Sequence, residues 1–107
     1  MAHPDAPGHT WLVECFAPGV QAAQVADVNR AAAAAARRLT AGGERIEYLG
    51  ATLLPDDEVV LLSFRAPSAD TVRAASGGLP LECGRVVASV TVAPGAAALD
   101  GGGASPR

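Results

Sequence analysis

The sequence predicts an α+β fold in which one four-stranded antiparallel sheet carries two helices on a single face. Three observations lead to this prediction. Residues 58–66 (EVVLLSFRA) place apolar side chains on both pleats, as expected for a strand inside a sheet. Residues 20–41 have helical apolar spacing and an alanine-rich centre. The remaining segments complete the order strand, helix, strand, strand, helix, strand, which places the first and third strands at the centre of the sheet.

The length and composition describe one domain with a thin core. The chain has 107 residues, and half of them are apolar, but alanine supplies much of that half. The formal charge of −3 gives no basic face, so we expect no nucleic-acid partner. No apolar run is long enough for a signal sequence or a membrane span, so we expect a cytoplasmic protein without a membrane partner. Because alanine buries little area, oligomerisation would add useful burial.

The first half of the chain contains an arm, a strand and the long helix. Residues 1–10 contain two prolines and show no periodicity, which predicts a flexible arm before a domain at 11–93. Trp11 to Phe16 alternates as a short strand, and the helix follows from Val20 to Ala41. The helical spacing predicts a buried stripe made of Val25, Val28, Ala32, Ala35, Ala36 and Leu39.

The second half predicts a hairpin, a short helix and a last strand. Strands at Glu44–Leu54 and Glu58–Ala66 flank a tight turn at 55–57, and Gly50 predicts a bulge in the first of them. Ser68 is a candidate N-cap for a helix at 69–76. The last strand is expected at 85–92, and residues 94–107 are expected to be a disordered tail rich in glycine and alanine.

This element order is the ferredoxin-like βαββαβ plan. Both helices cover one face of such a sheet, whereas the central strand at 58–66 is apolar on both faces. Something must therefore cover the second face. A second subunit is the simplest solution, so we expect a homodimer formed through the open sheet face.

Several short motifs resemble a family of small bacterial ferredoxin-like proteins, described as domains of unknown function, with one branch that binds nickel. The motifs are Leu12-Val13-Glu14 with Pro18-Gly19, Asp56-Asp57 in the hairpin, Ala66-Pro67-Ser68, and Gly78-Leu79-Pro80 before a valine-rich strand. The resemblance covers about residues 11–92. It implies a dimeric α+β fold, and it is the only reason to consider nickel. The only histidines that could bind such a metal are His3 and His9, both in the predicted arm.

Three side chains are candidates for chemistry on the sheet. Glu14 lies between apolar neighbours on its own face, where desolvation would raise the pKa of its carboxyl group and suit it to acid–base work. Tyr48 and Arg65 lie on strands that could converge on the same region. The alternative is that Arg65 and Glu14 simply form an ion pair.

The two cysteines, Cys15 and Cys83, are expected to be buried reduced thiols, with a disulfide the less favoured alternative. They could also act as a thiol pair or as soft metal ligands, but they lack CxxC spacing and a neighbouring histidine.

The sequence leaves two functions open. One is a non-catalytic module that binds a small ligand or a metal. The other is a cofactor-independent enzyme, such as an isomerase, cyclase or monooxygenase, that uses a cavity on the sheet. No P-loop, dinucleotide-binding motif, nucleophile elbow or histidine-containing triad is present. A cavity onto which Glu14, Tyr48 or Arg65 converges would favour the enzyme.

Overall fold

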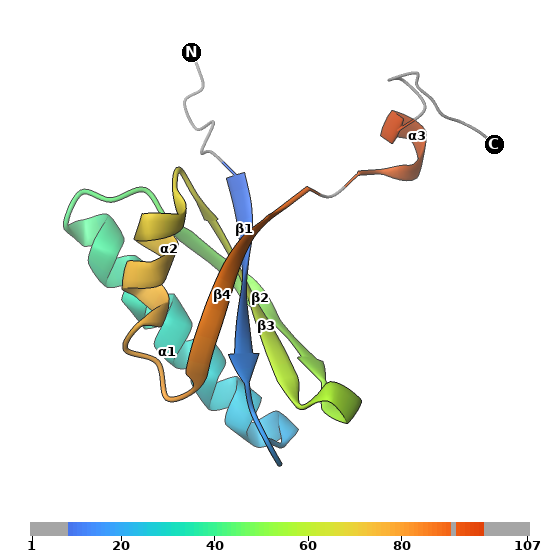
Figure 1. The fold of residues 1–107 in the computed structure, drawn as a ribbon. Helices are drawn as coiled ribbons and strands as arrows, with labels where there is room; N and C mark the ends of the chain where they lie inside the picture. The colour runs from blue at the N-terminus through green and yellow to red at the C-terminus, as the bar shows by residue number, and fades with distance from the viewer. Residues whose placement is uncertain (1–8, 91, 98–107) are drawn as a thin grey trace.

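The computed structural model describes residues 9–90 and 92–97. The predicted element order is confirmed, and Figure 1 shows the strands crossing the domain with the two larger helices to one side. One sheet contains all four strands in the antiparallel order β2-β3-β1-β4. Its strands are β1 (His9–Phe16), β2 (Glu47–Leu54), β3 (Val59–Ala66) and β4 (Glu82–Ser89).

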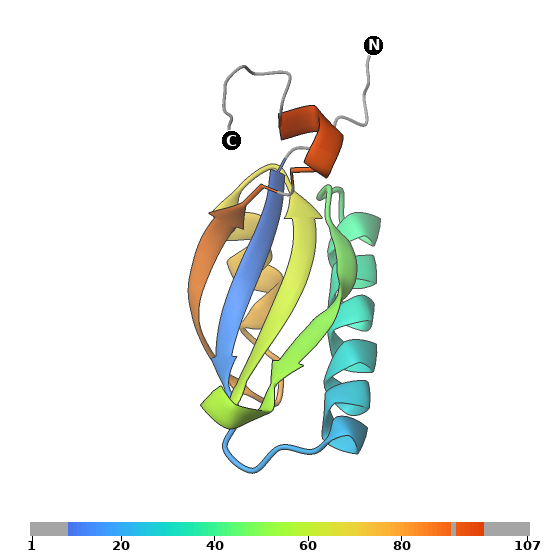
Figure 2. The ribbon, with the colours of Figure 1, turned by 90° about the vertical axis from the view of Figure 1, so that its right-hand side faces the viewer.

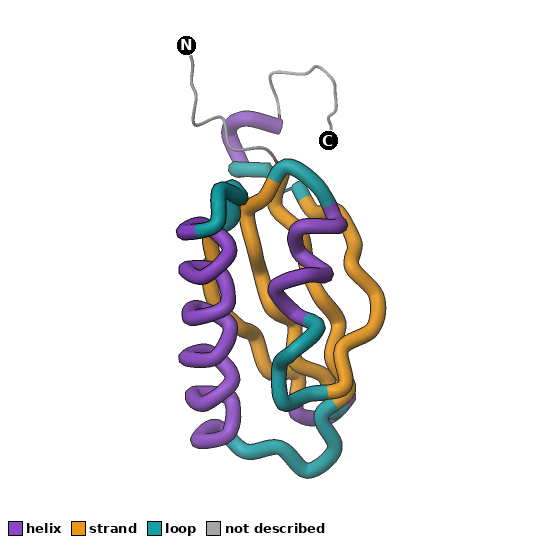
Figure 3. The backbone as a smooth tube through the Cα atoms, turned by 90° about the vertical axis from the view of Figure 1, so that its left-hand side faces the viewer, coloured by secondary structure: helices purple, strands orange, loops and turns teal. Residues whose placement is uncertain are grey.

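The two main helices, α1 (Ala22–Ala41) and α2 (Ala69–Ser76), cover the same face of the sheet, as Figure 3 shows from the helical side. Figure 2 shows the opposite face, on which the four strands lie in front of both helices. This is the predicted ferredoxin-like arrangement. It leaves one sheet face without a covering element from the described part of the chain.

Helix α1 buries the predicted stripe. Val28, Ala32, Ala35 and Ala36 are buried, and Val25 and Leu39 pack at the edge of the core. The helix begins two residues later than expected. Gln21 is its N-cap. The backbone N–H of Gln21 donates a hydrogen bond to Oε1 of Gln24 at 2.7 Å, so this backbone donor has a partner at the first turn.

Strand β3 lies at the centre of the core. Val60, Leu62 and Phe64 are fully buried on the helical side, and the alternate residues are partly exposed on the other side. The alanine side chains of α1 are small, so the helix can approach these residues closely. The central position predicted for residues 58–66 is therefore confirmed.

The hairpin carries the bulge expected at Gly50. The register between β2 and β3 shifts between Tyr48 and Gly50, and Gly50 has φ +140°, a region that residues with a side chain rarely adopt. The expected tight turn is one turn of 3₁₀ helix, η1 (Pro55–Asp57), which ends at Glu58 in the left-handed region with φ 57°. The prediction for α2 is correct at both ends, and the hydroxyl of Ser68 accepts a hydrogen bond from the Thr71 backbone N–H at 3.3 Å.

The ends of the domain differ from the prediction. His9 and Thr10, expected in the arm, form the first pairs of β1 with Ala66 and Arg65. Strand β4 begins and ends three residues earlier than expected, because Glu82 and Cys83 already pair with the end of β1 across a bulge. A short helix, α3 (Pro94–Ala97), lies in the region expected to be a tail. Residues 1–8 and 98–107, which make up most of the predicted arm and tail, lie outside the described residues.

The cysteine prediction was wrong. Cys15 and Cys83 form a disulfide that joins β1 to β4. Their strands pair directly, and the two residues face each other in the register on the helical side of the sheet. The spacing in sequence, 68 residues apart, gives no sign of this proximity. The bulge in the β1–β4 ladder creates it, and that bulge could not be predicted from the valine-rich pattern of the strand.

Candidate functional site

Two surfaces are candidates for function: the open face of the sheet and a groove between α1 and β2. On the open face, the register places Leu54, Val59 and Phe16 side by side in one row across three strands. Phe16 is 51% exposed and Leu54 is 36% exposed, and both lie next to Val59, so the exposed apolar side chains of this row are contiguous rather than scattered. We call the apolar residues of this face the open-face patch; they are Leu12, Phe16, Leu54, Val59, Leu61 and Val87.

The charged residues of the open face form pairs within the chain. A guanidinium nitrogen of Arg65 donates to Oε1 of Glu47 at 2.7 Å across the β2–β3 pair. Arg85 and Glu14 form a longer ion pair, with 3.8 Å between Nε and Oε1. The predicted pair between Glu14 and Arg65 is therefore not formed. Each guanidinium of the face has a carboxylate neighbour, so a second identical face would meet little unbalanced charge.

Glu14 does lie on the sheet face, opposite Leu61 in the register, as its strand position predicted. However, 41% of its side chain is exposed, so it is not enclosed by apolar neighbours. It borders a hollow of about 280 Å³ beside the disulfide, together with Phe16, Val59 and Arg85. This hollow opens at the end of β1 where the chain leaves the sheet.

Tyr48 lies on the opposite side of the sheet from Glu14 and Arg65. It pairs with buried Phe64 in the register, its ring lies 5.1 Å from the Phe64 ring, and its hydroxyl donates to the side-chain oxygen of Asn29 on α1. The three candidate residues therefore do not converge. The bulge at Gly50 and the alternation of the strands separate them, although strand positions alone made convergence plausible.

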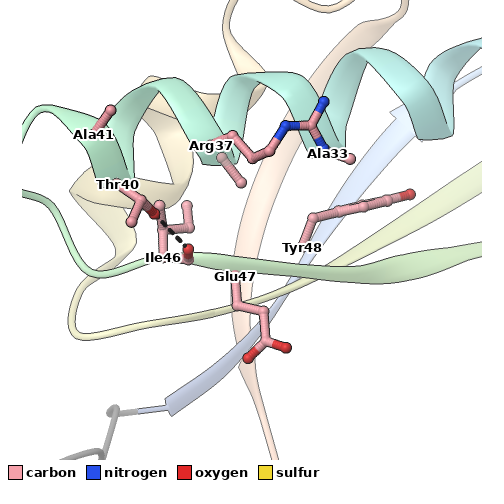
Figure 4. A pocket seen from close by; sticks show the side chains of 8 residues that line it. Ala33, Arg37, Thr40, Ala41, Ile46, Glu47 and Tyr48 are labelled. Atoms are coloured by element: carbon pink, nitrogen blue, oxygen red, sulfur yellow. Dashed lines mark hydrogen bonds between the residues drawn. The ribbon is translucent and has the colours of Figure 1, made fainter.

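Tyr48 forms one wall of the groove between the second half of α1 and the start of β2, shown in Figure 4. The groove has a volume of about 480 Å³. Its lining is mainly apolar because α1 presents alanines, whose methyl groups leave space that larger side chains would fill. The lining residues are Ala33, Ala36, Arg37, Thr40, Ala41, Ile46, Glu47 and Tyr48.

Burial raises the pKa of the Tyr48 phenol to about 12. Desolvation disfavours the phenolate, so the hydroxyl stays protonated at neutral pH and donates to Asn29. A general base of this type would need a lowered pKa instead. The Tyr48 side chain thus lines the groove, and its hydrogen bond to Asn29 connects β2 to α1.

Arg37 is the residue that the sequence analysis missed. It lines the groove, and Figure 4 shows its side chain extending along α1 above the Tyr48 ring. Within the described ranges no carboxylate pairs with it. Glu47 is the acidic residue of the lining. Its side chain points away from the helix and accepts a hydrogen bond from Arg65. One signal could have revealed Arg37: it lies four residues after Ala33, on the side of the helix next to the buried stripe.

The described residues contain no cluster of three or more histidine, cysteine or carboxylate groups that could hold a metal ion. His9 lies on β1 with its ring edge-on to Trp11, at a centroid distance of 6.1 Å. His3, the other histidine considered for nickel, lies outside the described residues. Among the helices that the structure describes, none has the length and apolar character needed to cross a membrane.

Comparison of the chain with protein-family models, with curated proteins and with solved structures finds no match.

Proposed function

We propose that this chain is a non-catalytic, homodimeric module for binding a small ligand. The observation that supports the proposal best is the open sheet face, on which the open-face patch has no covering element from residues 9–90 and 92–97. A face of this kind is stabilised when another apolar surface removes it from water. A second copy offers the same patch and the same balanced charges.

The size of the face suits such a dimer. Four strands about 4.8 Å apart and eight residues long, with a rise of about 3.3 Å per residue, span about 19 Å by about 26 Å. Two flat faces of that size bury at least about 1,000 Å² in total, near the lower limit for a specific interface. Side chains add to this area because they make the face uneven.

The charges of the face also favour a partner with the same surface. The pairs Arg65–Glu47 and Arg85–Glu14 neutralise most of its charge before association. Glu82, on the edge strand β4, is the one carboxylate of the face left over from these two pairs. Like-charge repulsion between two copies is therefore small and located at the edge.

Native mass spectrometry and sedimentation equilibrium test this proposal on the full chain. We expect the wild-type protein to have twice the mass of one chain. The double variant Phe16→Ser, Leu54→Ser should shift to monomer, since both side chains are already exposed and their loss costs the fold little. The matched control is Val92→Ser, which removes a side chain that is 57% exposed outside the sheet and should leave the dimer intact. A monomeric wild-type protein, or an unchanged dimer in the double variant, contradicts the proposal.

A further inference from the structure

We propose that the groove between α1 and β2 binds a small organic anion, with a carboxylate held by Arg37 and a flat apolar body lying against Tyr48 and the alanines of α1. This inference specifies the ligand class of the binding module proposed above. The groove is on the helical side of the sheet, so the proposed dimer through the open face would leave it accessible.

The lining selects the apolar body of the ligand. Ala33, Ala36 and Ala41 present only methyl groups, and Ile46 closes the floor as a buried residue. The Tyr48 ring provides a flat aromatic wall. A volume of about 480 Å³ falls within the usual range for small-molecule sites, which are mostly apolar with a few placed polar groups. A planar ring can offset-stack on the Tyr48 face.

The charge at the groove selects an anion. Arg37 carries a permanent positive charge, and a guanidinium matches a carboxylate with two parallel hydrogen bonds. No carboxylate of the described residues occupies it. The only acidic lining residue, Glu47, already accepts a hydrogen bond from Arg65 at 2.7 Å and points away from the helix.

The polar groups at both ends of the groove are already satisfied. The Tyr48 hydroxyl donates to Asn29, and the Thr40 hydroxyl donates to the carbonyl oxygen of Ile46 at 3.0 Å. The carbonyl groups of the last turn of α1 accept hydrogen bonds from the backbone N–H groups of residues 42–44, which reduces their negative end charge. Arg37 is thus the one charged group of the lining still available to a ligand.

Titrations of the uniformly ¹⁵N-labelled full chain, followed by amide chemical shifts, test the proposal with three probes of similar shape: benzoate, benzamide and benzylammonium. We expect saturable shifts with benzoate, confined to the second half of α1 and the start of β2. A ligand this small should bind with a Kd in about the millimolar range. Benzamide and benzylammonium should bind at least about fivefold more weakly, because they lack the negative charge that pairs with Arg37.

Three variants identify the groove. Arg37→Gln should weaken benzoate binding about tenfold and remove the preference over benzamide, whereas Arg38→Gln makes the same charge change at the next residue, outside the lining, and should have little effect. Ala33→Leu should block all binding by filling the groove, whereas Ala26→Leu, at an exposed position of the same helix, should not. The ¹⁵N spectrum of each variant shows whether it is folded.

Benzoate shifts that map to another surface overturn the inference, as do equal affinities for the three probes or unchanged binding in Arg37→Gln. An absence of saturable shifts also overturns it. These outcomes are independent of the dimer test: a monomeric protein that binds benzoate at Arg37 refutes the dimer alone, and a dimer that fails to bind refutes the groove alone.

Discussion

Reduction of the Cys15–Cys83 disulfide should destabilise the fold by a large fraction of its free energy of unfolding. The bond closes a loop with a sequence separation of 68 residues, which in the chain-entropy model corresponds to about 4.4 kcal/mol at 25 °C. Measured effects are commonly about 2 to 4 kcal/mol. Small domains are stable by only about 5 to 15 kcal/mol in total, so the loss would be easy to detect.

Urea denaturation with and without a reductant measures this effect. Trp11 is the only tryptophan, and its indole N–H donates to the carbonyl oxygen of Ala66 at 3.0 Å across β1 and β3, so its fluorescence reports on the intact sheet. With a slope of about 1.3 kcal/mol per molar urea, a loss of about 2 to about 4.4 kcal/mol lowers the midpoint by about 1.5 to about 3.4 M. The control is the double variant Cys15→Ala, Cys83→Ala, whose midpoint should not respond to the reductant.

Two results would refute this reasoning. Thiol titration of the unfolded, unreduced protein could find two free thiols per chain, which would mean that the cysteines are reduced as the sequence first suggested. Alternatively, the disulfide could be present and its reduction could move the midpoint by less than about 0.5 M. In that case the backbone pairing of β1 with β4 holds these two strands together without the covalent bond.

Three further predictions concern the core, the bulge and the groove. Truncation of the fully buried side chain in Phe64→Ala should cost about 3 to 5 kcal/mol in urea denaturation, and a loss below about 1 kcal/mol would show that this centre of the core can collapse. Gly50→Ala should cost about 1 to 3 kcal/mol because Gly50 has φ +140°, whereas Gly78→Ala, at a glycine without positive φ and with open space, should be neutral; equal effects would contradict the bulge. In a spectrophotometric titration, the single tyrosine, Tyr48, should ionise near pH 12 rather than 10. The phenol of the unfolded chain loses its proton at a lower pH than that of the folded chain, so the free energy of unfolding should fall as the pH rises from about 10 to about 12. This fall should be absent in Tyr48→Phe.

Sequence patterns predicted the parts of this fold that depend on local periodicity. The stripe of α1 followed from apolar residues spaced three and four apart, and the centre of the sheet followed from residues 58–66 being apolar on both pleats. Gly50 marked the bulge because glycine is one of the few residues that tolerate the backbone angle of that site. These signals are carried by residues that are close together in the chain, so they could be read in advance.

The site could not be predicted in the same way, because it depends on which strand faces lie together. Glu14 and Arg65 share the open face, but Glu47 lies directly opposite Arg65 and forms an ion pair with it. Tyr48 lies one position from Glu47 and therefore points to the helices. A single step along a strand reverses the face, so a candidate site assembled from three strands requires the register.

By itself, the sequence determined the order of the elements, the antiparallel sheet and the helical face, because periodicity and turn residues act locally. Only the tertiary structure decided that Cys15 forms a disulfide with Cys83, that Arg37 and Tyr48 line one groove, and that Glu14 and Tyr48 lie on opposite faces of the sheet. Each of these results depends on a strand register or on helix packing between residues far apart in the chain. Contacts between residues far apart in the sequence form only when the whole chain folds, so no local sequence pattern predicts them.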